Sequence, residues 1–117
     1  MNFPLPSKRF FLVIFFLSSC AAGMAQKVFS VEYESQADVK VFVVNYESQA
    51  DLLVYKVKYE SQAGKNDGLW FFTQYSSQAQ KKIFFEKYES HADLKIYFVN
   101  YESQAGWRNN SKKQLLY

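Results

Sequence analysis

Cysteine is nearly absent from this chain, which has one, Cys20, among its 117 residues. One cysteine cannot form a disulfide within the chain, and Cys20 precedes the part of the sequence that we expect to fold. Stability must therefore come from packing. The sequence supplies 12 phenylalanines, 9 tyrosines and 2 tryptophans for this purpose, and each aromatic side chain can bury about 150 to 250 Å².

No apolar run is long enough to cross a membrane. The run FFLVIFFL, Phe10–Leu17, has eight residues, whereas a spanning helix needs about 20. It follows Lys8 and Arg9, and a short basic stretch before a short apolar one is typical of an export signal. We therefore expect an exported protein, periplasmic or secreted, without a transmembrane span.

Two processing sites remain open. The small residues GMA before Gln26 favour a signal peptide of residues 1–25 and a single folded domain of residues 26–117. Alternatively, LSSC resembles a bacterial lipobox, which would make residues 1–19 a lipoprotein signal and Cys20 a lipid anchor to the bacterial envelope.

A strong charge of one sign is also missing. The formal net charge is +3, but Lys8 and Arg9 belong to the expected signal, so residues 26–117 carry only +1. A nucleic-acid-binding domain is expected to show a basic patch, whereas the lysines here are scattered among glutamates. We expect no nucleic acid partner.

What the chain does have is a phrase, YESQAD, repeated six times with small changes. The copies begin at Tyr33, Tyr46, Tyr59, Tyr75, Tyr88 and Tyr101, with a period of 13 residues that is broken once by a three-residue insertion between the third and fourth copies. Before each phrase stands an apolar stretch such as VFVVNY, whose side chains alternate between two faces, as in a β-strand. Regular repeats of this kind predict a fold built from one repeated unit.

The strands of the first three copies differ from those of the last three. One position reads Val28, Val41, Val54 and then Trp70, Ile83, Ile96, while the next position is aromatic in all six copies: Phe29, Phe42, Tyr55, Phe71, Phe84 and Tyr97. We expect this aromatic face in the core. Copies three and six end in Gly64 and Gly106, where the chain can change direction. The pattern predicts a compact, three-sided all-β structure of two interlaced three-repeat circuits, in which each copy lies beside the copy three further on.

These repeats resemble those of the 7(1) septoil knot domain family. The resemblance rests on the iterated YESQAD, on AGKNDGLWFF after copy three and on AGW with a basic tail after copy six, and it covers residues 27–117. It implies a small β domain whose chain is tied in a seven-crossing torus knot, with no established activity. The departures YSSQAQ and YESHAD put local packing in doubt more than topology.

The repeated phrase is predicted to form structural corners. Its tyrosine would pack, its glutamate would face solvent, its glutamine amide would bond backbone where chains cross, and its alanine would leave room. The corner residues are Tyr33, Gln36, Tyr46, Gln49, Tyr59, Gln62, Tyr75, Gln78, Tyr88, His91, Tyr101 and Gln104.

Catalytic and metal sites have weaker support. A calcium site takes six to eight oxygens from closely spaced acids, whereas each copy supplies one glutamate and sometimes an aspartate. Ser90 and His91 are neighbours, but adjacent residues on an extended chain point to opposite faces, and no Gly-x-Ser-x-Gly elbow is present. We expect no enzyme, no metal and no other cofactor.

The leading hypothesis is therefore a monomeric, non-catalytic structural domain whose topology makes unfolding slow. An alternative is an extracellular module that binds a ligand or protein through Trp107 and the loop of residues 64–68. A third is a strand-stacking polymer, because aromatic and glutamine-rich strands can form cross-β assemblies. The tail after Trp107 is expected to be exposed, with a closing strand at LLY, residues 115–117.

Overall fold

The computed structural model describes residues 25–117, so the expected signal segment and Cys20 lie outside the described residues. Strands and short 3-10 turns alternate along the described chain. The strands are β1 (Lys27–Ser30), β2 (Val39–Val43), β3 (Leu52–Lys56), β4 (Leu69–Phe72), β5 (Lys81–Phe85), β6 (Leu94–Phe98) and β7 (Gly106–Trp107). The turns are η1 (Glu34–Gln36), η2 (Glu47–Gln49), η3 (Glu60–Gln62), η4 (Ser76–Gln78), η5 (Glu89–His91), η6 (Glu102–Gln104) and η7 (Asn110–Leu116).

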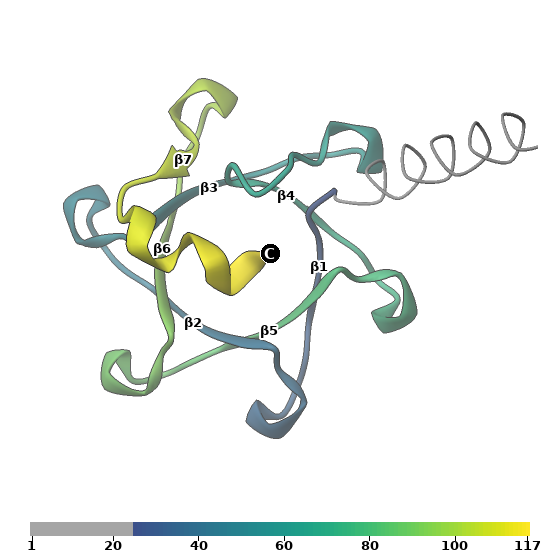
Figure 1. Cartoon of the computed structure of the whole chain (residues 1–117), viewed down its shortest axis with the longest axis horizontal. Helices are drawn as coiled ribbons and strands as arrows, with labels where there is room; N and C mark the ends of the chain where they lie inside the picture. Colours follow the sequence, from purple (N-terminus) through teal and green to yellow (C-terminus); the bar gives the residue numbers. More distant parts are fainter. Residues whose placement is uncertain (1–24) are drawn as a thin grey trace, which may run out of the picture.

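Strands β1 to β6 form a closed ring of parallel strands (Figure 1). The order around the ring is β4-β1-β5-β2-β6-β3, and a β3–β4 pairing closes it. First-circuit strands therefore alternate with second-circuit strands, which confirms the predicted interlacing. Each first-circuit strand pairs with the copy three further on, and β1 and β2 also pair with the copy four further on. The short strand β7 adds to β3 in the antiparallel direction.

Each strand leans across two neighbours. In β2, Val39–Val41 pair with β5, and Val41–Val43 pair with β6. The same shift from one neighbour to the next occurs in β1. Each of the strands β1 to β6 thus pairs with one ring neighbour through its first half and with the other through its second half.

The centre of the ring explains the difference between the two triplets. The Val position of copies one to three and the Trp or Ile position of copies four to six all point inward and are fully buried: Val28, Val41, Val54, Trp70, Ile83 and Ile96. In the ladders Val41 is paired with Phe85 on one side and with Leu94 on the other, so this small side chain stands between two larger ones. Alternating small and large residues fills a narrow interior without voids.

The aromatic face does not form this core, and our expectation was wrong on that point. The six aromatic side chains are half-buried on the outer wall of the ring. Eight strands already leave a barrel interior that side chains just fill, so a ring of six has no room for six aromatic rings in one layer. Phe42, Tyr55 and Tyr97 instead pack into a second, outer cluster, which includes Val44 and Ala50.

The C-terminal tail closes one end of the ring and does not form the strand that we expected at LLY. After β7 the chain turns into η7, which lies across the opening in Figure 1 and is called the plug below. Leu116 is fully buried against the central core, and Leu115 packs beside it. Since the pairing of β3 with β4 has already closed the ring, the tail covers the core instead of extending the sheet.

Three buried polar residues hold the plug. The amide nitrogen of Gln26 donates to the carbonyl oxygen of Leu116 at 2.9 Å, and that of Asn66 donates to the carbonyl oxygen of Lys113 at 2.9 Å. The third residue, Asp51, accepts backbone hydrogen bonds from Arg108 and Asn109 on its carbonyl oxygen. These bonds satisfy groups that would otherwise be buried unpaired.

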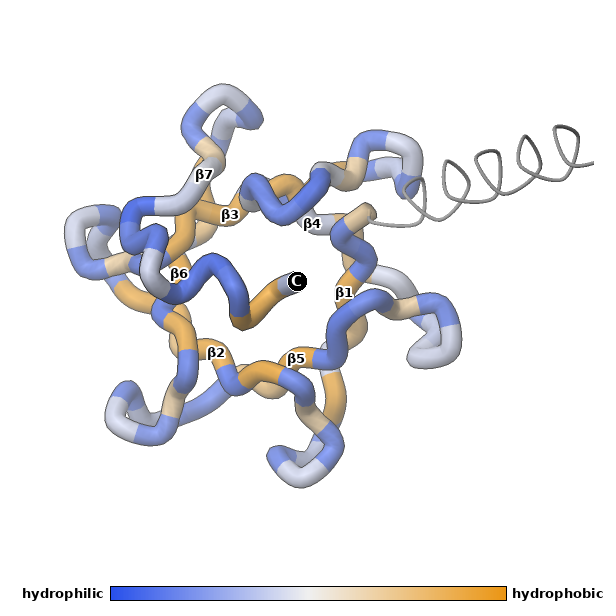
Figure 2. The backbone as a smooth tube through the Cα atoms, viewed as in Figure 1, coloured by the Kyte–Doolittle hydropathy of each residue, from blue (hydrophilic) through white to orange (hydrophobic). Residues whose placement is uncertain are grey.

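The opposite end of the ring, called the open end below, is lined by aromatic rings. Phe72, Phe85 and Phe98 stand two residues beyond the central layer, and Phe72 lies 6.5 Å from each of the other two rings. The ammonium group of Lys56 lies over Phe98, 4.6 Å from the ring centre, and over Phe72 at 5.4 Å. Figure 2 shows the resulting distribution, with apolar strands around the ring and polar corners outside it.

Candidate functional site

The six repeated phrases form six corners of the same geometry. In each corner the tyrosine is extended and a 3-10 turn follows it. The glutamine or histidine N–H donates to the tyrosine carbonyl at 2.9 to 3.1 Å, and the alanine N–H donates to the next carbonyl at 3.1 to 3.2 Å. The corners project outward all around the ring, as Figure 1 shows.

The corner tyrosines do not pack, contrary to our expectation. They are 62 to 67% exposed: Tyr33, Tyr46, Tyr59, Tyr75, Tyr88 and Tyr101. The reason is their position, because each tyrosine comes where the chain has left the wall of the ring. The alanine of the corner lies closer to the wall, and Ala50 belongs to the outer cluster.

The corner glutamines do not join crossing chains either. Gln62 accepts a hydrogen bond from the N–H of Tyr59 within its own corner at 3.1 Å, and Gln78 accepts a long one from Thr73 at 3.4 Å. The other residues at this position are exposed on the turns: Gln36, Gln49, His91 and Gln104. A glutamine on the projecting turn, three residues beyond an exposed tyrosine, does not reach a strand of the other circuit.

The aspartate that ends the phrase joins the two circuits. The Asp38 carboxylate accepts from the backbone N–H of Lys82 at 2.8 Å, while the Asp38 N–H donates to the carbonyl of Lys82 at 2.7 Å. Asp51 forms the same pair of bonds with Lys95 at 2.9 and 2.7 Å. Hydrogen bonds to a charged group are stronger than those between neutral groups, so each of these aspartates fastens its corner to the other circuit.

The third aspartate of this kind shows that the pattern runs in both directions. Asp93, in the second circuit, accepts from the N–H of Lys40 at 3.0 Å and donates to its carbonyl at 2.8 Å. Gln80 replaces aspartate in copy four and keeps the backbone bond, to Lys27 at 2.7 Å, while its side chain accepts from the Gln26 amide at 3.3 Å. The sequence carried a signal for these clamps, since aspartate recurs in three copies, each before a strand whose second residue is lysine or leucine.

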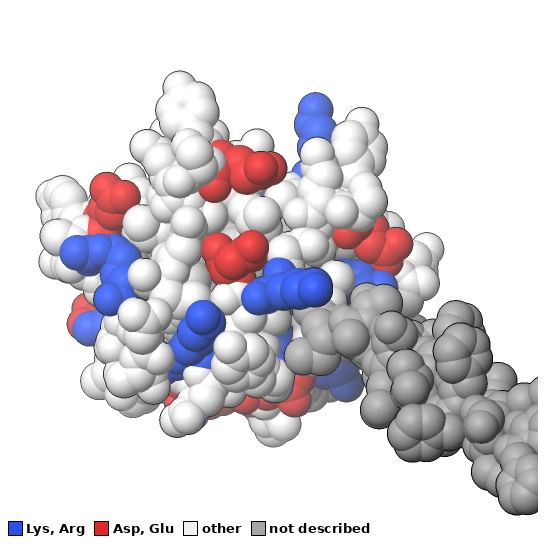
Figure 3. All heavy atoms as spheres, turned by 45° about the horizontal axis from the view of Figure 1, so that its top comes forward, with Lys and Arg blue, Asp and Glu red and all other residues white. Residues whose placement is uncertain are grey.

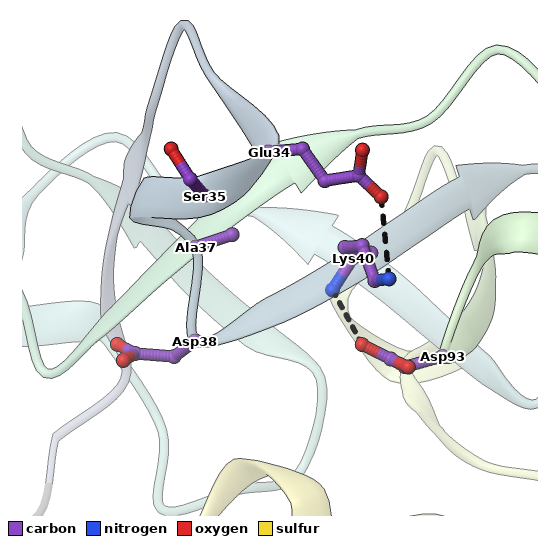
Figure 4. Close-up of a pocket in the computed structure, with 6 residues that line it drawn as sticks. All are labelled: Glu34, Ser35, Ala37, Asp38, Lys40 and Asp93. Atoms are coloured by element: carbon purple, nitrogen blue, oxygen red, sulfur yellow. Dashed lines mark hydrogen bonds and ion pairs between the residues drawn. The ribbon is translucent and has the colours of Figure 1, made fainter.

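A shallow depression of about 540 Å³ lies beside the first corner (Figure 4). The Lys40 ammonium group bonds the Glu34 carboxylate at 3.2 Å across it, and this hydrogen bond raises the pKa of Lys40. Asp38 and Asp93 also line the depression, where their carboxylates are already used as clamps. Ser35 points away from Lys40 in Figure 4, so this arrangement does not pair a nucleophile with a base.

No metal site is evident in the described part of the chain, because residues 25–117 contain no cluster of three or more histidine, cysteine, aspartate or glutamate side chains that could hold an ion. Across the same residues, no helix is long and apolar enough to cross a membrane. Figure 3 shows basic and acidic side chains interspersed on one face.

A comparison with known protein families adds to this geometry. The sequence matches the family model of the 7(1) septoil knot domain over residues 25–108. This chain belongs to the septoil knot domain family. The ring of interlaced circuits agrees with the knotted topology that the resemblance implied. No curated protein and no solved structure matched the chain.

One repeat of this septoil knot domain departs from the others at two positions. Glu86 stands where four copies have valine and one has threonine, and its side chain is only 7% exposed. One of its oxygens is buried without a hydrogen bond to any described residue, and the other lies 3.9 Å from Nδ1 of His91. His91 itself replaces glutamine in the same repeat and packs edge-on against Tyr88 at 5.5 Å. Glu86 was not predicted as a special residue, although it is the only charged residue in a column of four valines and one threonine.

Proposed function

We propose that this septoil knot domain is an exported, non-catalytic structural domain that resists unfolding and proteolysis through slow kinetics. The observation that carries the proposal is the pairing between circuits. Strands β1, β2 and β3 pair with β4 to β7 and not with one another. No strand can leave the ring without breaking ladders on both sides, so we expect unfolding to be slow and the stability of the domain to be kinetic. Non-local topologies of this kind also fold slowly.

The polar side chains support a structural role. The carboxylates of Asp38, Asp51 and Asp93 are engaged by backbone N–H groups of the other circuit. Groups bound in this way stabilise the fold and are poorly placed to act on a substrate. The export part of the proposal rests on the basic and apolar segment before Gln26.

The test is the unfolding rate in water, obtained by extrapolation from urea, together with digestion by proteinase K. We expect unfolding at or below about 10⁻⁵ s⁻¹, at the slow end for small domains. A matched control is the same domain cut once beside the exposed Lys65, which keeps the strands but separates the two circuits covalently. The cut form should unfold faster by a factor of about 10 or more. Unfolding within seconds, or equal rates for cut and intact chains, would contradict the proposal.

A second candidate function is that of a binding module. The expected binding surface, Trp107 and the loop of residues 64–68, is in part used by the fold itself. The indole N–H of Trp107 donates to Asn66, and both Asn66 and Gly68 are buried. Gly68 has φ +90°, and a side chain there would meet the carbonyl of Leu53. What favours a binding module is the uniform set of exposed corner side chains.

A further inference from the structure

The corners repeat a tyrosine and a serine whose side chains are exposed and make no evident contribution to the fold. Inside the ring, equivalent positions vary between valine, isoleucine and tryptophan. At the corners, by contrast, tyrosine and serine are the same in all six copies although both are exposed: Tyr33, Ser35, Tyr46, Ser48, Tyr59, Ser61, Tyr75, Ser77, Tyr88, Ser90, Tyr101 and Ser103. Duplication alone does not account for this difference, because the strands of the same repeats have diverged.

Hydrogen bonds within the chain do not explain why the tyrosine and the serine recur in every corner. The turns are formed by backbone bonds, and within residues 25–117 no corner tyrosine or serine hydroxyl donates a hydrogen bond to another residue. The alanine and aspartate positions of the corners, by contrast, have structural roles. Ala50 packs in the outer cluster, and Asp38 and Asp51 fasten the circuits. Exposed side chains without such a role usually contribute within about 0.5 kcal/mol to stability.

We propose that the six corners form a multivalent binding surface for a hydroxyl-rich polymer, namely a polysaccharide. This proposal deepens the binding-module candidate and does not depend on slow unfolding. A tyrosine ring offers an apolar face and a hydroxyl group, and serine, glutamine and glutamate follow it within three residues. Together they supply the donors and acceptors that sugar hydroxyls need.

The arrangement of the corners suits a partner with repeated units. Corners of the two circuits alternate around the ring, so sites that share a tyrosine and a serine project outward all around it (Figure 1). A weak site that is repeated on one rigid body gains effective affinity by a factor of 10² to 10⁴ when the ligand is also repeated. One small ring can therefore bind a polymer without any deep pocket.

The charge of the corners argues against polyanions. Five of the six corners carry a glutamate, which repels phosphates and sulfates. Glu34, Glu60 and Glu89 pair with lysines at 3.2, 2.9 and 3.7 Å, so the lysines beside these corners are offset by carboxylates and are not free to attract an anion. A lipid surface fits less well, because the tyrosines stand on separate corners and do not form one apolar patch.

The experiment is retention of the domain on insoluble cellulose, chitin and purified peptidoglycan. The variants replace tyrosine by alanine at one corner, at the three first-circuit corners (Tyr33, Tyr46 and Tyr59) or at all six. Val43→Ser and Phe85→Ser are matched controls, since they alter exposed apolar residues of the open end. We expect the wild type to be retained on at least one polymer. Retention should persist in 0.5 M salt, because salt screens charges and leaves contacts between neutral groups intact.

The loss should follow the number of altered corners and not their position. One change should weaken binding about 2- to 5-fold, three about 10-fold or more, and six should abolish it, with the controls unchanged. Absence of retention on all three polymers, wild-type retention of the six-corner variant, or loss in 0.5 M salt would overturn the proposal. Unfolding rates of the same variants separate the two ideas. Rates equal to wild type together with lost binding support the corner site, whereas faster unfolding of each single variant assigns the tyrosines to the fold and overturns it.

Discussion

The two ends of the ring shield the apolar core from water in different ways. At the plug end, Leu116 covers the core and buried polar residues bond the backbone of the tail. At the open end the rings of Phe72, Phe85 and Phe98 cover one another, and Phe85 stays 36% exposed. The tail at the plug end makes hydrogen bonds through its backbone, whereas the aromatic rings at the open end make only apolar contacts. We therefore expect the plug end to contribute more stability.

The largest expected effect comes from Leu116→Ala. This change removes a fully buried side chain, and such truncations lower the free energy of unfolding by about 2 to 5 kcal/mol. Phe85→Ala at the open end should cost about 1 kcal/mol or less, because its ring is already partly in water. Urea unfolding of both variants checks the comparison, and equal losses at the two ends would refute it.

The next prediction uses two aspartates in equivalent corners. Asp51 and Asp38 form the same clamp, but Asp51 also accepts from the side chain of Asn109 at 3.2 Å and lies 3.7 Å from the ammonium group of Lys112. Asp51→Ala should lower the free energy of unfolding by about 2 to 4 kcal/mol and Asp38→Ala by about 1 kcal/mol, since unpaired buried groups carry the larger penalty. The difference between the variants measures the attachment of the plug. It should vanish in a chain that ends after Trp107.

A gain is expected from Glu86→Val, which restores the residue found in most repeats. The buried carboxylate oxygen of Glu86 has no hydrogen bond to a described residue, and an unsatisfied buried group costs about 1 to 3 kcal/mol. The melting temperature should therefore rise, and His91→Gln is the control for the neighbouring change. A lower melting temperature for Glu86→Val would mean that the carboxylate has a compensating partner.

The smallest effect concerns the lysine at the open end. Lys56→Met keeps an apolar stem over Phe98 and Phe72 but removes the charge above the rings. Cation–π contacts at exposed sites contribute about 0.5 to 1 kcal/mol, so the loss should be close to that. Chemical denaturation at low and high salt checks it. An increase in stability would show that the rings favour an uncharged cover.

Much of the fold could be predicted because equivalent positions can be compared between the six repeats. The change from Val28, Val41 and Val54 to Trp70, Ile83 and Ile96 required two environments that recur three times each, and an interlaced ring supplies them. The choice of inner face could not be made in the same way. Alternation separates the two faces of a strand but does not say which face points to the axis of the ring. We expected the aromatic face to point inward, but the interior of a six-stranded ring is too narrow for it.

The candidate site was less predictable for a similar reason. The sequence singles out Tyr33 and Gln36 equally with Asp38, yet only Asp38 bonds the other circuit. Which corner residue reaches a neighbour depends on how far the turn projects, and this is a property of three dimensions. The plug was missed because its contacts join Gln26 and Asn66 to the tail across 90 and 47 residues.

The pairing pattern has a consequence for a chain that is made from its amino end. When the first three repeats have emerged from the ribosome, none of their strands has a partner, because β1 must wait for Phe71 and β2 for Ile83. The first ladder that can form joins β3 to β4, between Tyr55 and Leu69. Half of the polypeptide is thus a set of unmatched edges until the second half arrives. During every round of synthesis, a long apolar segment with unpaired strand edges is therefore exposed to aggregation until the second circuit is made.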